Sequence, residues 1–496
     1  PDRPCLIDLA LAGLAILVAV GLGIPFLAYT ADDAFITFRY GQHLSAGFGP
    51  VFNAGERVEG YTSFAWMLLM AAALALQLDP IVVSKILGLL STLATGALVF
   101  WAAGAGWPRP RRVAFIAVFL LVSNAEVAAS STSGLESTFF MAWITAAIAC
   151  ARREARRSSA PWSSLLFGVA ALTRPEGLAF FALHLLFLAL VSREKPARLL
   201  ARLGLFLLVV LPHWAWRMAY YGQPLPATYY AKLAPLTYRL ASGGFYVLPF
   251  LLLFAAVVVA ARLLRQPLPP YLLWMSAGGI AIAWWEGGDW MIGHRFLLPV
   301  VPAWSLLAGG TLSALHDRLA RGPTTGRHLA FGLIVAALVV MNAGQALRFR
   351  HYAAVRAEGY EGAHLALARW LDGRYDAGTT IALMDVGLIG YYSNLRVLDI
   401  TGLTDITIAR APGSIMDKVY DPGYVLDQEP AAVVLISRDD DLAPDFAVDR
   451  RLYDDPRFQA AYKLDHTLEH YRDSWMGTYV LLVFVRRTES GRSSQP

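Results

Sequence analysis

Cysteine and charged residues are both scarce in this chain. Only two cysteines occur among 496 residues, and both lie in or beside apolar segments, so no disulfide framework can be inferred. Charged residues make up 16% of the chain and hydrophobic residues 56%, with a mean hydropathy of +0.48. A soluble protein of this length would fold into several domains with a far more polar surface. The composition therefore excludes an ordinary soluble protein.

Short motifs that bind nucleotides or metals are also missing. The sequence has no Gly-rich phosphate loop, no Cys-x-x-Cys and no His-Glu-x-x-His. It therefore gives no support for a nucleotide or nucleotide-sugar site on the cytoplasmic side, and it shows no required cofactor. The net charge of +5 does not indicate nucleic acid either. The basic residues lie in short loops between apolar runs, where membrane orientation accounts for them.

Long apolar runs dominate the first 350 positions. Most of them are long enough to cross a bilayer core of about 30 Å as a helix. We predict eleven transmembrane helices, at 6–29, 82–104, 113–128, 137–151, 161–173, 178–192, 199–217, 245–263, 270–286, 296–314 and 328–346. A shorter run at 62–77 is expected to be an embedded or re-entrant helix. The expected fold class is thus an α-helical polytopic membrane protein.

Basic clusters set the predicted orientation. They occur at 108–112, 151–157, 193–202, 261–266 and 316–327, and the positive-inside rule places them in the cytoplasm. The loops with an unusual polar composition then lie outside, including the loop 30–61. After 346 the composition becomes mixed. Short buried strands are predicted at 379–386, 395–400, 431–437 and 478–487, and a helix is predicted at 361–373. We therefore divide the chain into a transmembrane domain, 1–346, and a small extracytoplasmic α/β domain, 347–496.

Two adjacent carboxylates follow the first predicted span, in "AYTADDAFITFRYG" (28–41). Asp32 and Asp33 are candidate catalytic residues, because a carboxylate in a partly dry site can take a proton from a sugar hydroxyl. A second carboxylate nearby would raise its pKa towards the useful range. The alternative is a helix cap, since Asp is favoured at such positions. The amphipathic stretch that follows is predicted to be a helix along the membrane interface.

Other polar residues of the outer loops are candidates for a sugar or acceptor pocket. Glu59 and Tyr61 lie in "GERVEGYTS", and Glu136 begins a span, where its charge would also suit the helix dipole. Arg174 lies in "LTRPEG" and is a candidate phosphate ligand, although an ion pair with Glu176 is the simpler interpretation. The further candidates for the sugar or acceptor pocket are Tyr229, Tyr230, Asp289, Trp290 and Asp385.

Three more cations on the outer face are candidate ligands for a donor phosphate. These are Lys232, His294 and Arg295, and each lies near aromatic residues, as expected where a lipid phosphate is held at headgroup depth. Arg295 has an alternative role as a residue that snorkels from the start of a span. A divalent metal also stays open, because Asp32, Asp33 and Glu136 offer hard oxygen donors.

One continuous stretch resembles a known family. "ADDAFITFRYGQHLSAGFGPVFNAGERVEGYTSFAW" (31–66) is similar to the mycobacterial terminal β-(1→2)-arabinofuranosyltransferases, within the GT-C superfamily of polyprenyl-phosphate-sugar-dependent glycosyltransferases. The resemblance implies a lipid-phosphate sugar donor, an essential Asp32 or Asp33, and a glycan or protein acceptor that enters from outside. It also implies a bacterial inner (plasma) membrane location. Members of that family extend further at the C-terminus, so the acceptor stays open.

The expected function is therefore the transfer of a sugar, with D-arabinofuranose implied by the resemblance, to an extracytoplasmic acceptor. An inverting and a retaining course both stay open. Two other classes of function remain as alternatives. A transporter or flippase of lipid-linked sugars would need ionisable groups near the middle of the membrane. A non-catalytic glycan-binding assembly protein would tolerate the loss of both aspartates.

Overall fold

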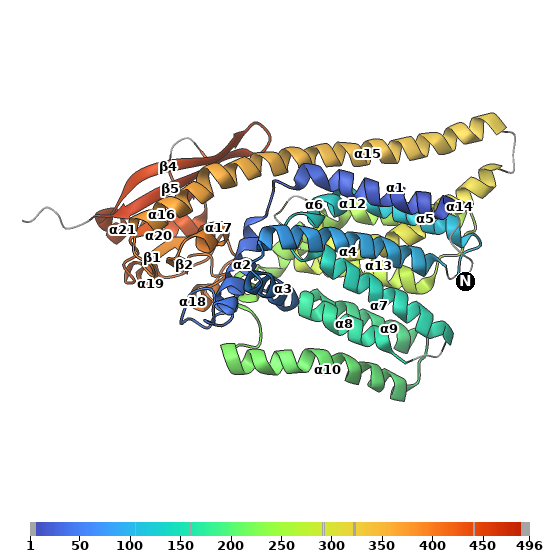
Figure 1. Ribbon diagram of the computed structural model, residues 1–496, viewed down its shortest axis with the longest axis horizontal. Coiled ribbons are helices and arrows are strands. Elements are labelled where there is room, and N and C mark those ends of the chain that lie inside the picture. Colours follow the sequence, from blue (N-terminus) through green and yellow to red (C-terminus); the bar gives the residue numbers. More distant parts are fainter. Residues whose placement is uncertain are drawn as a thin grey trace, which may run out of the picture.

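The computed structural model describes residues 6–104, 106–157, 160–289, 291, 293–320, 324–439 and 442–487. The molecule is elongated, with a bundle of helices at one end and a mixed α/β region at the other (Figure 1). The helical part consists, in chain order, of α1 (Leu6–Gly23), η1 (Ile24–Phe26), α2 (Asp32–Ser45), α3 (Phe64–Ala75), α4 (Pro80–Ala103), α5 (Pro110–Val122), α6 (Ala125–Ser131), α7 (Ser137–Arg157), α8 (Trp162–Thr173), α9 (Glu176–Leu190), α10 (Pro196–Tyr221), α11 (Ala227–Ala231), α12 (Leu236–Leu263), α13 (Pro270–Glu286), η2 (Arg295–Val300) and α14 (Val301–Ala320).

The protein is a multi-pass membrane protein, but fewer helices span by length than the sequence predicts. Among the described residues, four helices are long and apolar enough: α4, α10, α12 and the continuous unit Arg295–Leu319. A fifth is obtained if α5 and α6, which meet at a 60° bend, count as one span. Asn124 begins α6 by accepting from the amides of Glu126 and Val127, so the predicted span 113–128 is broken there. The number of eleven transmembrane helices stays a prediction.

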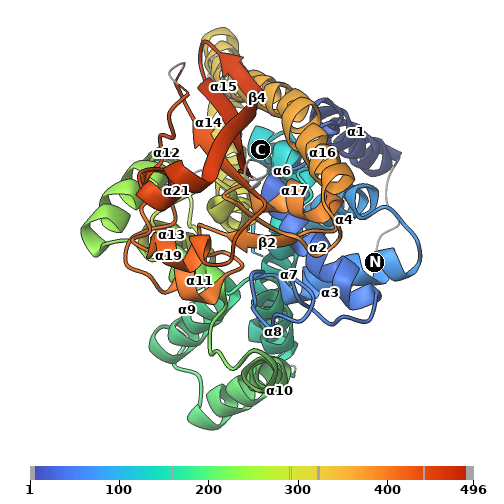
Figure 2. The ribbon, with the colours of Figure 1, turned by 90° about the vertical axis from the view of Figure 1, so that its left-hand side faces the viewer.

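Part of the predicted outer loop 30–61 is helical, because α2 covers Asp32–Ser45. Its amphipathic sequence forms a helix as predicted, and the residues from Ala34 to Gly41 are buried. One side packs on α3 and another on α17 (Val386–Tyr392) of the α/β region, as Figure 2 shows. Arg39 of α2 donates to the carbonyls of Phe52 and Leu395, both at 2.7 Å. The helix is therefore held between the bundle and the α/β region.

The α/β region contains a five-stranded mixed sheet with the order β2-β1-β3-β5-β4. β1 is parallel to β2 and β3, whereas β5 is antiparallel to β3 and β4. The strands are β1 (Thr380–Leu383), β2 (Arg396–Asp399), β3 (Ala432–Ser437), β4 (Tyr462–Asp473) and β5 (Gly477–Arg486); the helices besides α17 are η3 (Tyr360–Leu365), α16 (Ala366–Arg374), α18 (Ile406–Ala409), α19 (Pro422–Leu426), α20 (Ala447–Tyr453) and α21 (Pro456–Ala461). Four strands and the helix at 360–374 match the prediction. β4 was not predicted, because most of its positions are exposed.

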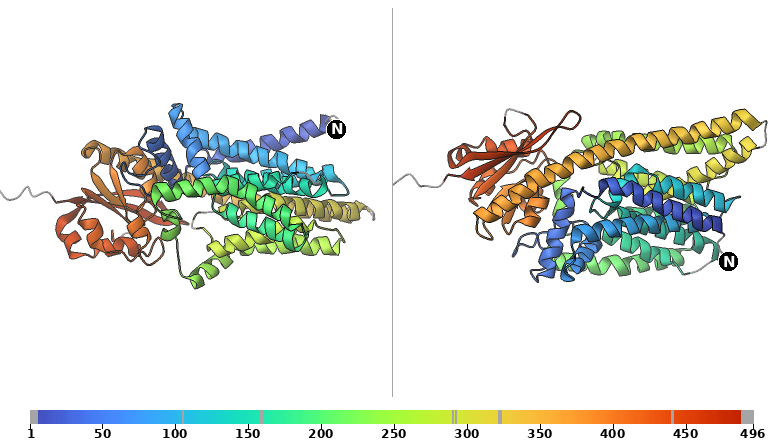
Figure 3. Two further views of the ribbon diagram at one scale, coloured as in Figure 1. Left: turned by 90° about the horizontal axis from the view of Figure 1, so that it is seen from below. Right: turned by 45° about the horizontal axis from the view of Figure 1, so that its top comes forward.

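A single long helix joins the two regions. α15 (Thr324–Gly359) has 36 residues and would extend over about 54 Å at 1.5 Å per residue. It runs along the bundle and continues into the α/β region (Figure 3). The proposed boundary between residues 346 and 347 therefore falls inside a continuous helix. Near its end, Phe349 and Tyr352 pack in one buried cluster with Tyr29.

Candidate functional site

The aspartate pair lies in the first turn of α2, where the bundle meets the α/β region. Neither carboxylate caps α2 itself, because the cap position is Ala31 and no side chain makes a capping bond there. Asp32 instead accepts hydrogen bonds from the backbone amides of Gly387 (3.1 Å) and Leu388 (2.7 Å) at the start of α17. Asp32 therefore does bind the amides at the start of a helix, but this helix is α17 of the α/β region and not α2.

The contact between Asp32 and α17 leaves no space for a side chain at Gly387. A Cβ atom there would lie 2.1 Å from the Asp32 carbonyl oxygen and 2.6 Å from Asp32 Oδ2. Real Cβ atoms do not approach backbone oxygens this closely. A glycine is therefore required at 387 for the two backbones to meet.

A second carboxylate, that of the partly buried Asp385, lies close enough to Asp32 to act on its charge. Its Oδ2 accepts from the Tyr479 hydroxyl at 2.7 Å and lies 2.9 Å from Nε2 of the buried His364. Burial raises the pKa of Asp32 to about 6; the charge of Asp385 acts in the same direction and His364 opposes it. Burial would also raise the pKa of Asp385, but the hydrogen bond to His364 lowers it overall. The predicted residue Asp385 thus contributes to the environment of Asp32.

Asp33 points to a different set of partners. Its Oδ2 lies 3.6 Å from Nη2 of Arg295, and 24% of its side-chain surface is exposed. Arg295 also forms an ion pair with Asp289, with 3.2 Å between Nη2 and Oδ1. Three predicted site residues, Asp33, Asp289 and Arg295, therefore come together.

Arg174 forms the second cationic part of this site. Its Nη1 donates to Glu136 Oε1 at 2.6 Å, and its Nε donates to Glu176 Oε1 at 3.0 Å. The predicted ion pair with Glu176 is confirmed, and Glu136, the residue directly before α7, also pairs with Arg174. The guanidinium groups of Arg174 and Arg295 lie 5.2 and 5.5 Å from the centre of the Phe296 ring. Two cations thus share one aromatic side chain near Asp33.

His294 is directed towards Glu126, a carboxylate that is not among the candidates predicted from the sequence. Its Nδ1 contacts Glu126 Oε1, which also accepts from Gln345 Nε2 at 2.6 Å. Glu126 is buried in α6. It falls inside the predicted span 113–128, and an ionisable residue within a span is itself a signal of function. That signal could have identified Glu126.

Glu59 and Tyr61 belong to a separate cluster with α10. Glu59 Oε2 lies 2.7 Å from Arg217 Nε, and the hydroxyl groups of Tyr61 and Tyr221 are 3.2 Å apart. Arg217 and Tyr221 both come from α10, which extends beyond the predicted span 199–217, and neither residue is a candidate from the sequence. Burial raises the pKa of Glu59 to about 7, against the opposing effect of Arg217.

The residues of α11 lie beside this second cluster. The Ala227 amide donates to the Glu59 carbonyl at 2.8 Å, which fixes the start of α11 to the loop. Lys232 is exposed at the end of α11, and half of the Tyr229 surface is exposed. Tyr230 lies under the guanidinium group of Arg410. The last predicted pocket residue, Trp290, lies outside the described residues.

The three candidate metal ligands, Asp32, Asp33 and Glu136, have separate partners. Within the described part of the chain, no three side chains of the His, Cys, Asp or Glu type converge on a common point. Asp32 is bound by α17, Asp33 faces Arg295, and Glu136 pairs with Arg174. These carboxylates are thus directed to protein donors.

Solved structures with the same architecture define the class of fold. ArnT from Cupriavidus metallidurans, bound to undecaprenyl phosphate, matches with a TM-score of 0.58 and 15% identity, over 97% of this chain and 99% of that chain. The oligosaccharyltransferase AglB from Archaeoglobus fulgidus, in complex with an inhibitory peptide and a dolichol-phosphate, matches with a TM-score of 0.51 and 12% identity, over 86% and 69% of the two chains. The chain has the GT-C fold, as predicted.

Sequence similarity points to particular relatives within that class. The terminal beta-(1->2)-arabinofuranosyltransferase of Mycobacterium tuberculosis is 30% identical in an alignment of 348 positions that covers 59% of this chain and 54% of that protein. The protein of the same name from Corynebacterium glutamicum is 29% identical in an alignment of 329 positions that covers 55% of this chain and 46% of that protein. This chain spans about half the length of these relatives. Residues 350–484 also match a family described as a domain of unknown function (DUF8728).

Proposed function

We propose that this protein is a membrane glycosyltransferase that moves a sugar from a polyprenyl phosphate to an acceptor outside the cytoplasm. The observation that carries the proposal is the aspartate pair at the junction of the two regions, with Asp33 facing Arg295 and Arg174 close by. The GT-C fold and the arabinofuranosyltransferase relatives support the same class of reaction. A site at one end of the bundle suits an enzyme better than a transport pathway through its middle.

The two aspartates take different roles in this proposal. Both oxygens of Asp32 are engaged by backbone amides of α17, so Asp32 positions α2 against the α/β region. Asp33 is the carboxylate that meets the substrate. In an inverting transfer, it removes the proton from the acceptor hydroxyl, whose oxygen bonds to the sugar carbon as the bond to the lipid phosphate breaks. In a retaining transfer, either Asp33 bonds to the sugar carbon as the bond to the lipid phosphate breaks and the acceptor oxygen then displaces it, or the acceptor oxygen bonds to the sugar carbon on the side that the phosphate leaves. In both cases the departed phosphate takes the proton of the acceptor hydroxyl.

The arginines near Asp33 are proposed to hold the donor phosphate. A guanidinium group has five donors, so Arg295 and Arg174 can bind phosphate oxygens and keep part of their ion pairs with Asp289, Glu136 and Glu176. The negative charge that develops on the leaving phosphate would then be stabilised from two sides. His294 lies next to Arg295 and is kept in place by Glu126.

The remaining predicted residues are proposed to form the acceptor side of the site. Glu59 and Tyr61 lie with α10 and α11, where the exposed Tyr229 offers a group to a glycan or protein acceptor. Lys232, predicted as a donor phosphate ligand, is exposed at the end of α11. D-arabinofuranose is the sugar that the relatives favour. The same proposal places eleven crossings in a bacterial inner membrane, with the site and the α/β region 347–496 outside.

The test is a transfer assay with purified protein in lipid nanodiscs. A synthetic polyprenyl-phosphate arabinofuranose serves as donor and an arabinan oligosaccharide as acceptor, and the product is measured by mass spectrometry. We expect transfer by the wild type and none by Asp33→Asn, with equal thermal unfolding temperatures. The anomeric configuration of the product, read by NMR, distinguishes the inverting from the retaining course. Full activity of Asp33→Asn would contradict the proposal and favour a transporter or an assembly protein.

A further inference from the structure

A cavity lies at the opposite end of the helical bundle from the aspartate pair. It has a volume of about 360 Å³ and is formed by the end of α7, by α9 and by the segment that leads into α13. Arg156 of α7 follows Glu136 by 20 positions, a rise of about 30 Å along a helix. This distance is close to the thickness of a bilayer core. The cavity and the proposed catalytic site therefore face opposite surfaces of the membrane.

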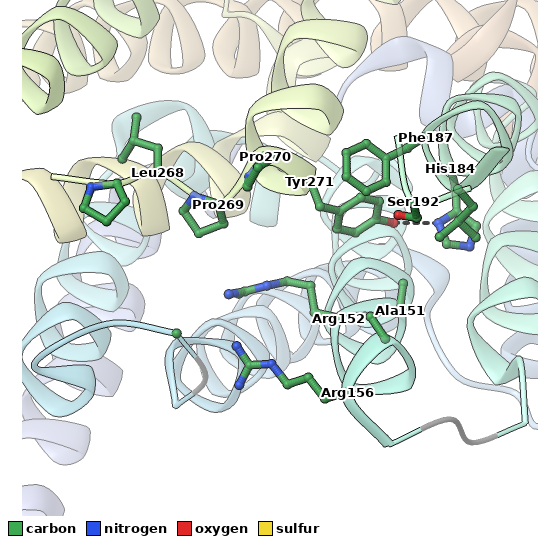
Figure 4. Close-up of a pocket in the computed structure, with 14 residues that line it drawn as sticks. Ala151, Arg152, Arg156, His184, Phe187, Ser192, Leu268, Pro269, Pro270 and Tyr271 are labelled. Carbon is green, nitrogen blue, oxygen red and sulfur yellow. Dashed lines mark hydrogen bonds between the residues drawn. The ribbon is translucent and has the colours of Figure 1, made fainter. Parts of the chain in front are cut away.

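Two arginines dominate the polar wall of this cavity. Arg152 and Arg156 are one helical turn apart, and their side chains extend from α7 into the cavity (Figure 4). A Cβ atom at Gly106 would lie 2.9 Å from Arg156 Nη2 and 3.9 Å from Arg152 Nη2, so both guanidinium groups approach the same point. Two like charges this close favour an anion between or beside them.

The described residues that line the cavity carry no carboxylate, and Arg152 donates from Nη1 to the Ala102 carbonyl at 3.0 Å. Glu154, on the same turn of α7, is directed away to Arg202 of α10 at 2.7 Å and to the Ser163 hydroxyl at 2.8 Å. The acid that is closest in sequence is therefore already used in another ion pair.

The rest of the wall is largely apolar and suits a lipid; its other polar groups are Ser192 and the pair His184 and Tyr271, which are hydrogen-bonded to each other at 2.8 Å. Phe187 and Leu188 come from α9, and Leu268 with the neighbouring prolines comes from the segment 267–270. α13 begins at Pro270, so the positive end of its dipole also lies at the cavity wall. A molecule with a phosphate at one end and hydrocarbon at the other matches both parts of the wall.

We propose that this cavity binds the headgroup of an anionic phospholipid, with the phosphate held by Arg152 and Arg156. The cluster at 151–157 is cytoplasmic by the positive-inside rule, and the cytoplasmic leaflet is the one that carries anionic lipid. The site is separate from the proposed donor site, and binding there does not depend on sugar transfer. Its ligand is a lipid of the membrane itself.

The proposal is tested by native mass spectrometry on the full-length protein released from a neutral detergent. Dioleoyl phosphatidylglycerol and dioleoyl phosphatidylcholine are supplied in equal amounts, so that only the headgroup differs. We expect the wild type to retain phosphatidylglycerol preferentially and Arg156→Gln to lower that preference at least fivefold. Arg156→Lys keeps the charge and should keep most of the preference. The double variant Arg152→Gln/Arg156→Gln should remove it.

The control is Arg111→Gln, which changes an exposed arginine in another predicted cytoplasmic cluster. We expect it to leave the lipid preference unchanged, which separates a defined site from general surface charge. An unchanged preference in Arg156→Gln and in the double variant would overturn the proposal, as would an equal loss in Arg111→Gln. Displacement of the lipid by 10 mM inorganic phosphate would also overturn it and assign the cavity to a soluble anion.

Discussion

Asp32 of α2 accepts a hydrogen bond of 2.7 Å from the backbone amide of Leu388, a residue 356 positions further along the chain. This bond joins the turn that carries the aspartate pair to the α/β region. The geometry of Asp33 therefore depends on a part of the chain outside the membrane bundle. The consequences of this connection can be measured.

Replacement of the two aspartates should separate chemistry from positioning. Asp33→Asn removes the proposed base or nucleophile and should lower the transfer rate by about 10²–10⁴-fold with little change in stability. Asp32→Asn should weaken the bonds to α17 and lower the free energy of unfolding by about 1–3 kcal/mol, along with activity. Transfer rates and thermal unfolding are the two measurements. The control is Asp376→Asn, at an exposed position, and equal stability losses in both aspartate variants would contradict this separation.

The raised pKa of Asp32 predicts a pH dependence of stability. Burial raises this pKa from 3.8 to about 6. Between these values the folded protein holds a proton that the unfolded chain has released, so this group's contribution to the free energy of unfolding falls as pH rises from 4 to 6. We expect the difference in stability between wild type and Asp32→Asn to change over that range. Chemical denaturation at several pH values measures it, and a constant difference would contradict the prediction.

Gly387→Ala should disturb the site without changing any polar group. The new Cβ atom would overlap with the Asp32 carbonyl oxygen at 2.1 Å, so α2 and α17 must separate. We expect a loss of about 1–3 kcal/mol in the free energy of unfolding and a clear loss of transfer activity. Gly373→Ala in α16 is the matched control, because nothing lies within 4 Å of its Cβ position. Equal behaviour of the two variants would show that the contact at 387 is not tight.

Arg295→Gln should weaken binding of the lipid donor. Arg295 contacts both Asp33 and Asp289, so its loss removes a phosphate ligand and leaves Asp289 without its cation. We expect at least a tenfold rise in the KM for the polyprenyl-phosphate sugar. Arg295→Lys should recover only part of the affinity, since an ammonium group cannot replace a bidentate guanidinium. Lys463→Gln, on exposed β4, is the control and should leave the KM unchanged.

Much of the fold can be predicted because its signals are local. Hydrophobic runs of four to six residues identify β1 and β3, and the amphipathic period identifies α2. The Arg174–Glu176 pair is also local, since two positions separate its members. Span lengths were harder to predict, because a single capping residue such as Asn124 breaks an apolar run that composition alone treats as continuous.

The partners of the site residues could not be predicted from sequence. Asp32 meets Leu388, Glu59 meets Arg217 and Arg174 meets Glu136, and each contact depends on how distant helices pack. The sequence identifies residues that carry suitable chemistry. Only the tertiary structure assigns Asp32 and Asp33 to different partners, although they are neighbours in the chain.

The unbroken course of α15 has a mechanical consequence. A flexible linker would let the sheet rotate freely over the membrane, whereas a helix that is embedded at one end and packed at the other acts as a stiff lever. Any tilt of the sheet, such as one imposed by a bulky acceptor, must then bend α15 or be transmitted to the bundle. Because Tyr352 of α15 packs against Tyr29, three residues before Asp32, that force would arrive beside the aspartate pair.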